Sequence, residues 1–415
     1  MAAEAAANSH YRGEPAGRGK QQSQFAQKRS CVTRCHLSQQ AAQQVESRKR
    51  LQVSTPAWIA TAPTTPTMTS IHDYDYELPR ELIAQHPLPN RADARLLVVD
   101  RRTRSWESTH VRELPTLLHP GDVLVLNDTR VIRARLLGYR KQTRGRWEGL
   151  FLEASPEGIW KVLSKTRGKL RPGETVVLQD RTARDGIELA MLSPLSGGIW
   201  AARPLEAAPF LDLLERYGRV PLPPYIRDGN MLDEDVERYQ TVFAKHPGSV
   251  AAPTAGLHFT PPLLDAIRRR GVGVEQVTLH VGIGTFRPVA TETLEEHQMH
   301  AEWGQVSADV ARRLRECRAS GGRVVAVGTT VVRLLESATS DAGTRSWQGS
   351  TDLFIRPPYE FRAIDSLLTN FHLPRSTLLV LVRTFGGDDL IRRAYQYAVA
   401  QRYRFYSYGD AMLIL

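Results

Sequence analysis

Runs of consecutive apolar residues recur along the chain and predict strands that are buried on both faces. A central strand of a parallel sheet carries apolar side chains at every position, whereas a half-exposed strand alternates apolar and polar residues. Runs of the first kind occupy residues 95–100 and 122–127, and further strands are predicted at residues 274–281, 323–327 and 377–385. They predict one mostly parallel sheet.

Amphipathic segments lie between these runs and predict helices. They occupy residues 209–217, 261–270, 307–318 and 388–402. The second helix begins after Thr260, a good N-cap residue, with Pro261 at its first position. Strands that alternate with helices are typical of the α/β class. We therefore expect an α/β fold in which helices cover a mostly parallel sheet.

The pattern changes between residues 134 and 204 to short alternating runs that Gly and Pro interrupt, with no convincing helix. Short strands at this spacing predict a small all-β domain, a barrel. The chain accordingly divides into a first α/β part (68–133), an inserted β-barrel domain (134–204) and a second α/β part (205–415).

Residues 1–67 are rich in Ala, Gln, Ser, Thr and Arg and contain almost no branched apolar or aromatic residues. Such a segment cannot bury enough surface to offset the entropy of ordering, so we expect disorder. An organellar transit peptide has a similar composition and remains an alternative. Since a structured pattern begins directly after Met68, our hypothesis is that Met68 is the true start.

Composition limits the function classes without choosing among them. The 415 residues are 41% hydrophobic, enough for a real core, and no apolar run is long enough to span a membrane. The formal net charge of +11 divides into +6 for residues 1–67 and +5 for the rest, which is compatible with an RNA partner. Three cysteines cannot build a disulfide framework, which favours the reducing cytoplasm.

Polar side chains follow the predicted strands in four places, the first at Asn127-Asp128-Thr129-Arg130. Ligands of open α/β sheets bind at the carboxyl ends of strands. A cap in which Asp128 and Thr129 bond local backbone is an equally good interpretation.

The second place consists of two segments that combine glycine with histidine. Gly256 precedes His258 in the segment 252–260 and permits an unusual backbone conformation, although a lone histidine before a helix is more often a packed or capping residue. His280 ends a predicted strand, and Gly282 and Gly284 after it let a ligand approach the backbone. The segment lacks the third glycine of a dinucleotide fingerprint, and His297 and His300 lack the spacing of a zinc site.

The third place is a strand–turn–helix over residues 327–336, in which Thr329 and Thr330 open the helix. Free backbone N–H groups at a helix N-terminus suit a carboxylate or phosphate. Arg333 and Glu336 share one face of this helix, and a plain surface ion pair between them is an equally good interpretation.

The fourth place is the segment 369–374, in which Asn370 and His372 point to one face if the chain is extended, and these groups suit a flat base. Ordinary loop packing is a serious rival. The chain's end, residues 402–410, interleaves Arg with Tyr and Phe, a pattern that suits RNA contact by stacking but equally suits aromatics docked into the core.

Taken together, these segments resemble one family, the S-adenosylmethionine:tRNA ribosyltransferase-isomerases of queuosine biosynthesis. The resemblance runs from about Tyr74 to Ala411 in the same order. The matching blocks are residues 76–79, 83–87, 127–132, 221–226, 238–243, 250–260, 278–282, 327–330, 369–374 and 408–411.

The resemblance implies an α/β domain with an inserted β-barrel, and an unusual reaction. Members transfer and isomerise the ribosyl part of S-adenosylmethionine onto 7-aminomethyl-7-deazaguanine at the wobble position of a tRNA with a GUN anticodon. The products are epoxyqueuosine-tRNA, adenine and methionine. S-adenosylmethionine is a consumed substrate, and no cofactor, metal or membrane is implied. We expect a cytoplasmic monomer.

The resemblance also assigns roles to residues in the matching blocks. The catalytic candidates are His258, His280, His372 and Asp128, with His258 favoured as the base that removes a proton beside the sulfonium. The substrate-binding candidates are Arg130, Thr254, Gly256, Gly282, Thr329, Thr330, Arg333 and Asn370. Of these, Thr329 and Thr330 suit the methionine carboxylate, and Arg130 and Arg333 suit that carboxylate or a tRNA phosphate.

The chain departs from the family pattern at a few positions. Val331 stands where Ser is usual, Pro358 and Gly386 replace Gly and Ala, and Trp147 and Gly149 are unusual in the insert. None of these removes a candidate group. Two alternatives remain: an S-adenosylmethionine-dependent RNA methyltransferase, which would want a glycine-rich loop where the chain has Arg101-Arg102-Thr103-Arg104, and a non-catalytic tRNA-binding module.

Overall fold

A computed structural model describes residues 69–282 and 291–415. The predictions for residues 1–67, and for Gly284 at the end of its glycine pair, lie outside the described residues. Among the described helices, none is long and apolar enough to cross a membrane.

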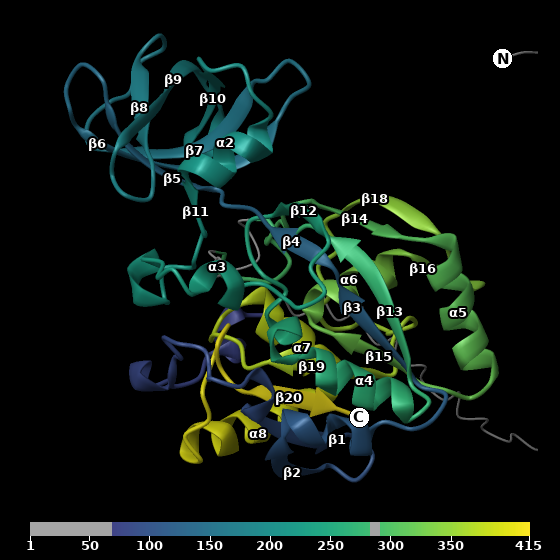
Figure 1. Cartoon of the computed structure of the whole chain (residues 1–415). Coiled ribbons are helices and arrows are strands. Elements are labelled where there is room, and N and C mark those ends of the chain that lie inside the picture. The colour runs from purple at the N-terminus through teal and green to yellow at the C-terminus, as the bar shows by residue number, and fades with distance from the viewer. Residues whose placement is uncertain (1–68, 283–290) are drawn as a thin grey trace, which may run out of the picture. The chain divides into compact units, whose positions relative to one another are not determined.

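Nine strands of the described chain form one sheet around four parallel central strands (Figure 1). The central strands are, in spatial order, β13 (Gly273–Leu279), β3 (Val123–Asn127), β15 (Val324–Val327) and β19 (Ser366–Asn370). Flanking them are β18 (Trp347–Thr351) and β14 (Glu302–Val306) on one side, and β20 (Ala411–Ile414), β1 (Arg95–Asp100) and β2 (Ser105–His110) on the other. Parallel pairing brings the carboxyl ends of all four central strands to one edge.

Helices cover both faces of this sheet. Successive residues of β3 alternate between two apolar clusters, Val123 and Val125 facing one and Leu124 and Leu126 the other. The first cluster takes residues from α5 (Ala308–Ala319), α6 (Thr329–Ser337), α7 (Thr377–Gly386) and α8 (Asp388–Ala400), and the second takes residues from α1 (Leu114–Leu117) and α4 (Pro261–Arg269). The predicted fold class, a mostly parallel sheet covered by helices, is confirmed.

The strand predicted at residues 377–385 is wrong, because this segment is helix α7. Its side chains pack between the sheet and other helices, so they are apolar on nearly every side and imitate a buried strand. The signal for a helix is Ser376, whose side chain accepts a hydrogen bond from the Leu379 N–H at 3.2 Å. The predicted N-cap role of Thr260 is confirmed in the same way, by a bond from the Leu263 N–H at 3.3 Å.

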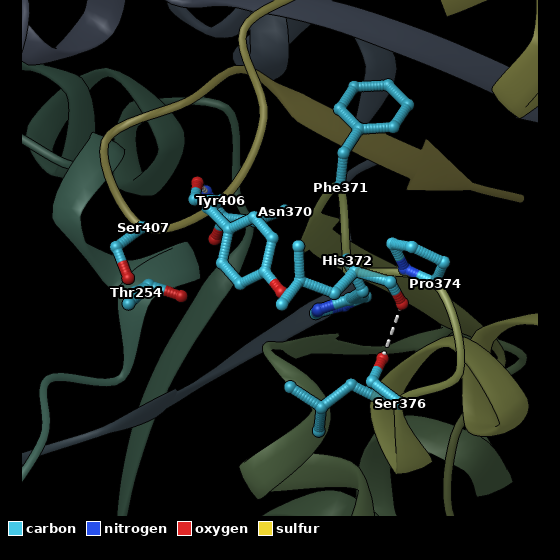
Figure 2. Close-up of a pocket in the computed structure, with 10 residues that line it drawn as sticks. Thr254, Asn370, Phe371, His372, Pro374, Ser376, Tyr406 and Ser407 are labelled. Atoms are coloured by element: carbon cyan, nitrogen blue, oxygen red, sulfur yellow. Dashed lines mark hydrogen bonds between the residues drawn. The ribbon is translucent and has the colours of Figure 1, made fainter. Parts of the chain in front are cut away.

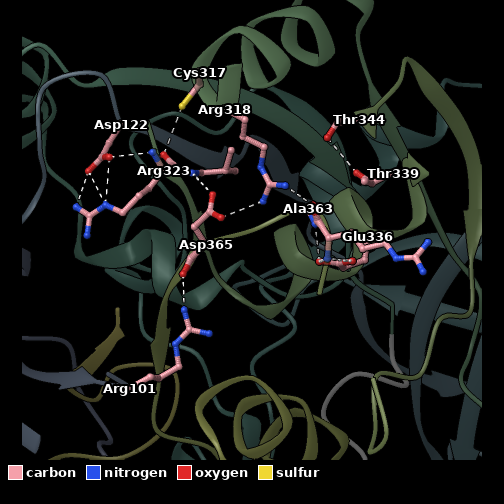
Figure 3. Close-up of polar contacts among 12 residues, drawn as sticks. Arg101, Asp122, Cys317, Arg318, Arg323, Glu336, Thr339, Thr344, Ala363 and Asp365 are labelled. Carbon is pink, nitrogen blue, oxygen red and sulfur yellow. Dashed lines mark hydrogen bonds and ion pairs between the residues drawn. The ribbon is translucent and has the colours of Figure 1, made fainter. Parts of the chain in front are cut away.

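A network of charged groups ties the amino ends of the central strands together (Figure 3). Asp122, just before β3, pairs with Arg323, just before β15, at 2.6 Å. Asp365, just before β19, accepts a hydrogen bond from the Val324 N–H at 2.8 Å and contacts Arg318 at 3.2 Å. The edge of the sheet opposite to the carboxyl ends is thus fixed by ion pairs within the protein.

Within the described residues, six strands close into an antiparallel barrel, which confirms the predicted all-β insert (Figure 1). Their order is β5 (Arg135–Arg140), β6 (Arg146–Ala154), β7 (Trp160–Thr166), β10 (Ile199–Pro204), β9 (Asp185–Pro194) and β8 (Thr175–Gln179), which pairs back to β5. The apolar interior also takes Leu213 and Leu214 from α2 (Phe210–Tyr217). Smaller elements are β11 (Gly218–Arg219), α3 (Asp235–Arg238), β16 (Thr339–Ser340), β17 (Gly343–Thr344), and the parallel pair β4 (Thr129–Val131) and β12 (His246–Ser249).

The two unusual residues of the insert form a matched pair inside the barrel. Trp147 is fully buried, and its indole ring lies over the Cα of Gly149, where a Cβ would clash with the ring. The indole N–H donates to Ser164 Oγ at 2.7 Å, so the ring cannot move aside without losing this bond. The glycine therefore makes room for the tryptophan.

This packing predicts that Gly149→Ala destabilises the protein by about 1–3 kcal/mol, the usual cost of overpacking a core. The chain offers a matched control, because Gly349 follows Trp347 on β18 with the same spacing, and a Cβ there would lie 3.4 Å from the ring, in ordinary contact. Gly349→Ala should change stability by less than about 0.5 kcal/mol. Urea unfolding of both variants measures the difference, and equal stabilities would contradict the packing argument.

Candidate active site

The polar segments singled out in the sequence gather at the carboxyl edge of the central sheet. Asn127 to Arg130 follow β3, His280 to Gly282 follow β13, Gly328 to Thr330 follow β15, and Asn370 to His372 end β19. The short helix Thr254–His258 also lies here, since a Cβ on Gly328 would be 3.6 Å from Ala255 Cβ. Segments more than 200 residues apart in the chain thus form one candidate site.

Asn127 links two of these strands through its side chain. Its Nδ2 donates to the Leu279 carbonyl at 2.9 Å, and its Oδ1 accepts from the N–H groups of Leu279 at 3.0 Å and Thr129 at 3.1 Å. The local cap is therefore Asn127, and not Asp128 and Thr129 as the cap interpretation of the sequence had it, because their side chains contact Thr278 and His280. It also fixes the position of the residues that follow both strands.

His280 is held by groups from several strands. Its Nδ1 lies 2.8 Å from Thr129 Oγ1, and its ring stacks on Trp303 with centroids 5.2 Å apart. Gly248 leaves space for the ring, because a Cβ there would lie 2.7 Å from it. Burial, and secondly His246, lower the pKa of His280 below the ordinary 6.5, so the ring is neutral near pH 7.

Asp128 lies beside this histidine and is buried. Its Oδ1 accepts a hydrogen bond from Thr278 Oγ1 at 2.7 Å, and its Oδ2 lies 3.6 Å from His246 Nε2. The carboxylate is therefore placed by the strand β13, and its second oxygen faces an exposed histidine at the surface of the site.

His258 and His372 are both nearly inaccessible to solvent, and burial lowers their pKa values to about 4 and about 3. His258 Nε2 lies 3.2 Å from Asn370 Nδ2, and His258 also has a hydrogen bond with the backbone of Arg91. His372 Nε2 lies 2.8 Å from Thr369 Oγ1. Both rings are neutral at physiological pH and are held by hydrogen bonds within the protein.

Two tyrosines that the sequence analysis missed hold the backbone of His372. The Tyr76 hydroxyl donates to the His372 carbonyl at 2.5 Å, and the His372 N–H donates to the Tyr395 hydroxyl at 3.1 Å. The two rings also contact each other edge to face. Tyr76 belongs to one of the blocks that matched the family, which is the signal that could have identified it.

The Arg333 guanidinium is bonded to groups of the protein and is not exposed to a ligand. It is buried, forms an ion pair with Glu302, and donates to the Leu353 carbonyl at 3.0 Å. Glu302 in turn accepts from the Gly282 N–H at 2.8 Å. The alternative of a surface ion pair between Arg333 and Glu336 is wrong, because Glu336 is also buried and instead accepts from backbone N–H groups, including that of Ala363 at 3.0 Å (Figure 3).

The predicted helix N-terminus is present at α6. Gly328 is the N-cap and has a φ of +90°, a conformation that favours glycine. Because glycine has no side chain, no N-cap side chain competes for the backbone N–H groups of Thr329 and Thr330. Both threonines are buried, and Asn127 Nδ2 lies 3.4 Å from Thr330 Oγ1. Val331, which replaces the usual serine, packs into the apolar core.

The structure shows the surroundings of two glycines that were predicted to bind substrate, Gly256 and Gly282. Gly256 does not adopt the unusual backbone conformation expected of it, since its φ is not among the positive ones. It is a glycine because a Cβ there would lie 2.9 Å from Thr241. Gly282 lies on the wall of a cavity of about 510 Å³, which Pro221, Ala251 and barrel residues such as Lys165 also line.

The RNA-stacking surface proposed for residues 402–410 is not present. Tyr403, Phe405, Tyr406 and Tyr408 are all buried, so the alternative of aromatics docked into the core is correct. Arg130, in contrast, is exposed and lies on the wall of a second cavity of about 350 Å³, together with Lys245. Among the described residues, no three His, Cys, Asp or Glu side chains are grouped as a metal site.

Comparisons with known proteins place these residues in context. Residues 71–414 match the model of a family described as "Queuosine biosynthesis protein". The S-adenosylmethionine:tRNA ribosyltransferase-isomerase of Symbiobacterium thermophilum is 51% identical over 347 residues, 83% of this chain and 99% of that protein. The protein of the same name from Halothermothrix orenii is 47% identical with the same coverage. A crystal structure of S-adenosylmethionine tRNA ribosyltransferase from Thermotoga maritima is 38% identical, covers 83% of this chain and 100% of that one, and has a TM-score of 0.47.

The lowered pKa values of His258 and His372 predict that stability falls as the pH falls from 6.5 towards 4. Unfolding returns each histidine to its ordinary pKa near 6.5, so the unfolded chain binds more protons in this range. Each histidine should contribute a slope of about 1.4 kcal/mol per pH unit to the free energy of unfolding.

The measurement is urea unfolding at pH 7.5, 5.5 and 4.5 of the wild type and of His258→Gln and His372→Gln. In each variant, the slope of the free energy of unfolding against pH should be shallower than in the wild type by the contribution of one histidine, about 1.4 kcal/mol per pH unit. Gly349→Ala provides the control, since it removes no titratable group and should leave the slope unchanged. Variants that retain the full wild-type slope would contradict the buried, neutral state of these rings.

Proposed function

This chain belongs to the family of queuosine biosynthesis proteins whose relatives are S-adenosylmethionine:tRNA ribosyltransferase-isomerases, and on that premise we propose the reaction and the roles of its residues. The enzyme transfers and isomerises the ribosyl part of S-adenosylmethionine onto 7-aminomethyl-7-deazaguanine in tRNA. The products are epoxyqueuosine-tRNA, adenine and methionine. The observation that carries the proposal is the 51% identity along almost the whole length of a relative of that activity.

The chemistry needs a base, a path for adenine to leave and a neutral amine. The sulfonium acidifies the ribose carbon next to it, and a base removes a proton from that carbon. The aminomethyl nitrogen attacks as the free amine, and adenine departs with a proton. A base of this kind must be unprotonated and oriented by a second group.

The contacts favour His280 as this base over His258, which the sequence favoured. The His258 ring forms hydrogen bonds with two groups of the protein, the Asn370 side chain and the Arg91 backbone, and these occupy the nitrogens that a base would need. His280 is only half-buried, and Thr129 orients it through Nδ1. Among the residues that the structure describes, Nε2 has no hydrogen-bond partner, so it is left for the substrate proton. Its lowered pKa keeps it unprotonated near pH 7.

The other candidates have supporting roles in this proposal. Asp128, one of whose oxygens faces outward beside His280, holds the attacking amine. Thr329 and Thr330 offer N–H groups at the start of α6 to the methionine carboxylate. The exposed Arg130 pairs with a tRNA phosphate. Arg333 positions Gly282 through Glu302 and does not contact substrate.

The cavity of about 510 Å³ beside Gly282 is the place proposed for S-adenosylmethionine. Its volume lies in the range of about 300–1,000 Å³ that is usual for sites of drug-sized ligands. Its wall includes Arg135, Glu148 and Lys165 of the barrel, so both folds contribute to it. We propose that the enzyme acts as a monomer in the cytoplasm, where a tRNA substrate is available.

The reaction predicts free adenine and a modified nucleoside when the full chain is mixed with S-adenosylmethionine and tRNA bearing 7-aminomethyl-7-deazaguanine. Chromatography measures adenine, and mass spectrometry of the digested tRNA measures epoxyqueuosine. With a labelled methyl group, the label should remain on methionine. Label in the tRNA would instead establish a methyltransferase, and tRNA binding without turnover would establish a binding module.

The assignment of the base predicts that His280→Gln lowers kcat by about 10²–10⁴, the usual contribution of general base catalysis. In the wild type, kcat should fall as the pH falls through the pKa of His280, which lies below 6.5, because the protonated ring cannot accept a proton. His119→Gln, far from the site, should leave kcat unchanged. A His280→Gln variant with wild-type kcat, alongside an inactive and folded His258→Gln, would transfer the role to His258.

A further inference from the structure

A small polar cavity lies next to His372, between the end of β19 and the C-terminal segment (Figure 2). Its volume is about 30 Å³, which is room for about two water molecules. It is lined by Thr254, Asn370, Phe371, His372, Leu373, Pro374, Ser376, Leu378, Tyr406 and Ser407. The lining contains no Asp, Glu, Lys or Arg. His372 is uncharged at neutral pH because its pKa is about 3, so the cavity wall carries no charge there.

Asn370 presents an unused acceptor at this cavity. The side chain is 2% exposed, and its Nδ2 donates to the Tyr406 carbonyl at 3.2 Å and lies 3.2 Å from His258 Nε2. The Tyr406 carbonyl fixes the orientation of the amide, since a flipped amide would set two acceptors against each other. Its Oδ1 is buried and has no hydrogen-bond partner among residues 69–282 and 291–415.

Tyr406 presents an unused hydroxyl. The ring is 7% exposed, and within the same described ranges its hydroxyl has no hydrogen-bond partner either. In Figure 2 the ring lies between Ser407 and His372. Burial raises the pKa of this phenol, so the hydroxyl stays protonated and can both donate and accept.

The backbone of Tyr406 is held in an unfavourable conformation that aims this side chain. Its φ of +72° lies in the left-handed region, which a bulky residue rarely adopts. Two hydrogen bonds maintain it, one from the Tyr406 N–H to the Phe371 carbonyl at 3.1 Å and one from Asn370 Nδ2 to the Tyr406 carbonyl. Strain that the surroundings maintain is typical of functional sites.

We propose that Asn370 Oδ1 and the Tyr406 hydroxyl form a subsite for the amino-bearing edge of a purine-type base. The amide oxygen accepts an N–H of the amino group, and the hydroxyl bonds the adjacent ring position. A carboxylate does not fit, because it would face an acceptor and no cation. The cavity admits an amino group and not a whole base, and Phe371, Leu373, Pro374 and Leu378 supply apolar surface beside it.

This inference rests on the proposed function, which brings two such bases to the site. Adenine of S-adenosylmethionine carries a 6-amino group beside a ring nitrogen, and 7-deazaguanine carries a 2-amino group beside a ring N–H. Both present the same donor to Asn370 Oδ1, so the experiment must distinguish the two sources.

The test compares binding of each substrate with that of an analogue lacking the amino group, for the wild type and for Tyr406→Phe. One pair is S-adenosylmethionine and its analogue with hydrogen in place of the 6-amino group. The other pair is tRNA with 7-aminomethyl-7-deazaguanine and tRNA whose base lacks the 2-amino group. The wild type should prefer the amino-bearing member of one pair by about tenfold, because only that member donates to Asn370 Oδ1. Tyr406→Phe should bind both members of that pair about tenfold more weakly than the wild type, because both carry the ring position that the hydroxyl bonds.

The matched control is Tyr403→Phe, a buried tyrosine of the same segment whose hydroxyl bonds Ser108 Oγ at 2.5 Å instead of lining the cavity. It should keep the wild-type affinities for both members of each pair. A wild type with no preference in either pair would overturn the subsite and leave a cavity for water alone, and this outcome does not require the Tyr406 variant to fold. Unchanged affinities in folded Tyr406→Phe would also overturn it. Because binding is measured, an amino preference without release of adenine would refute the proposed reaction and leave the subsite standing.

Discussion

Parallel pairing of four strands is the constraint on which the candidate site depends. Because β13, β3, β15 and β19 run in the same direction, the residues that follow them meet at one edge although they come from distant parts of the chain. Asn127 adds a side-chain link between two of these strands, and the ion pairs of Asp122 and Asp365 fix the opposite edge. The loops at the carboxyl edge are therefore positioned by the sheet and not by their own sequence.

The chemistry of the site follows from burial within this frame. Three histidines are kept neutral, and two of them have lost nearly all contact with solvent. Neutral rings suit a reaction whose substrate already carries a positive sulfonium, since a protonated ring nearby would repel it. The half-buried His280 is different from the others because one of its nitrogens is not fixed by the protein contacts described, which is the property that a proton acceptor needs.

The sequence predicts the strands and helices of the α/β part well where the pattern is regular, and it fails where burial hides the pattern. Helix α7 is apolar on nearly every side and is misinterpreted as a strand for that reason. Strand β20 is an apolar run of only four residues at the chain's end, and a run this short does not by its pattern alone distinguish a strand from an apolar tail. Among the site residues, the motifs identify His280 and Asn370, but the commitment of Arg333 to Glu302 and the strain at Tyr406 arise from residues far apart in the chain.

The pairing of Trp147 with Gly149 restricts how the barrel can change over evolutionary time. The tryptophan fits only over a residue without a Cβ, whereas a glycine at position 149 tolerates a smaller residue at 147. A path on which the side chain at 149 is lost before the indole ring enters the core therefore avoids an overpacked intermediate. The reverse path avoids the same intermediate only when the tryptophan is replaced first.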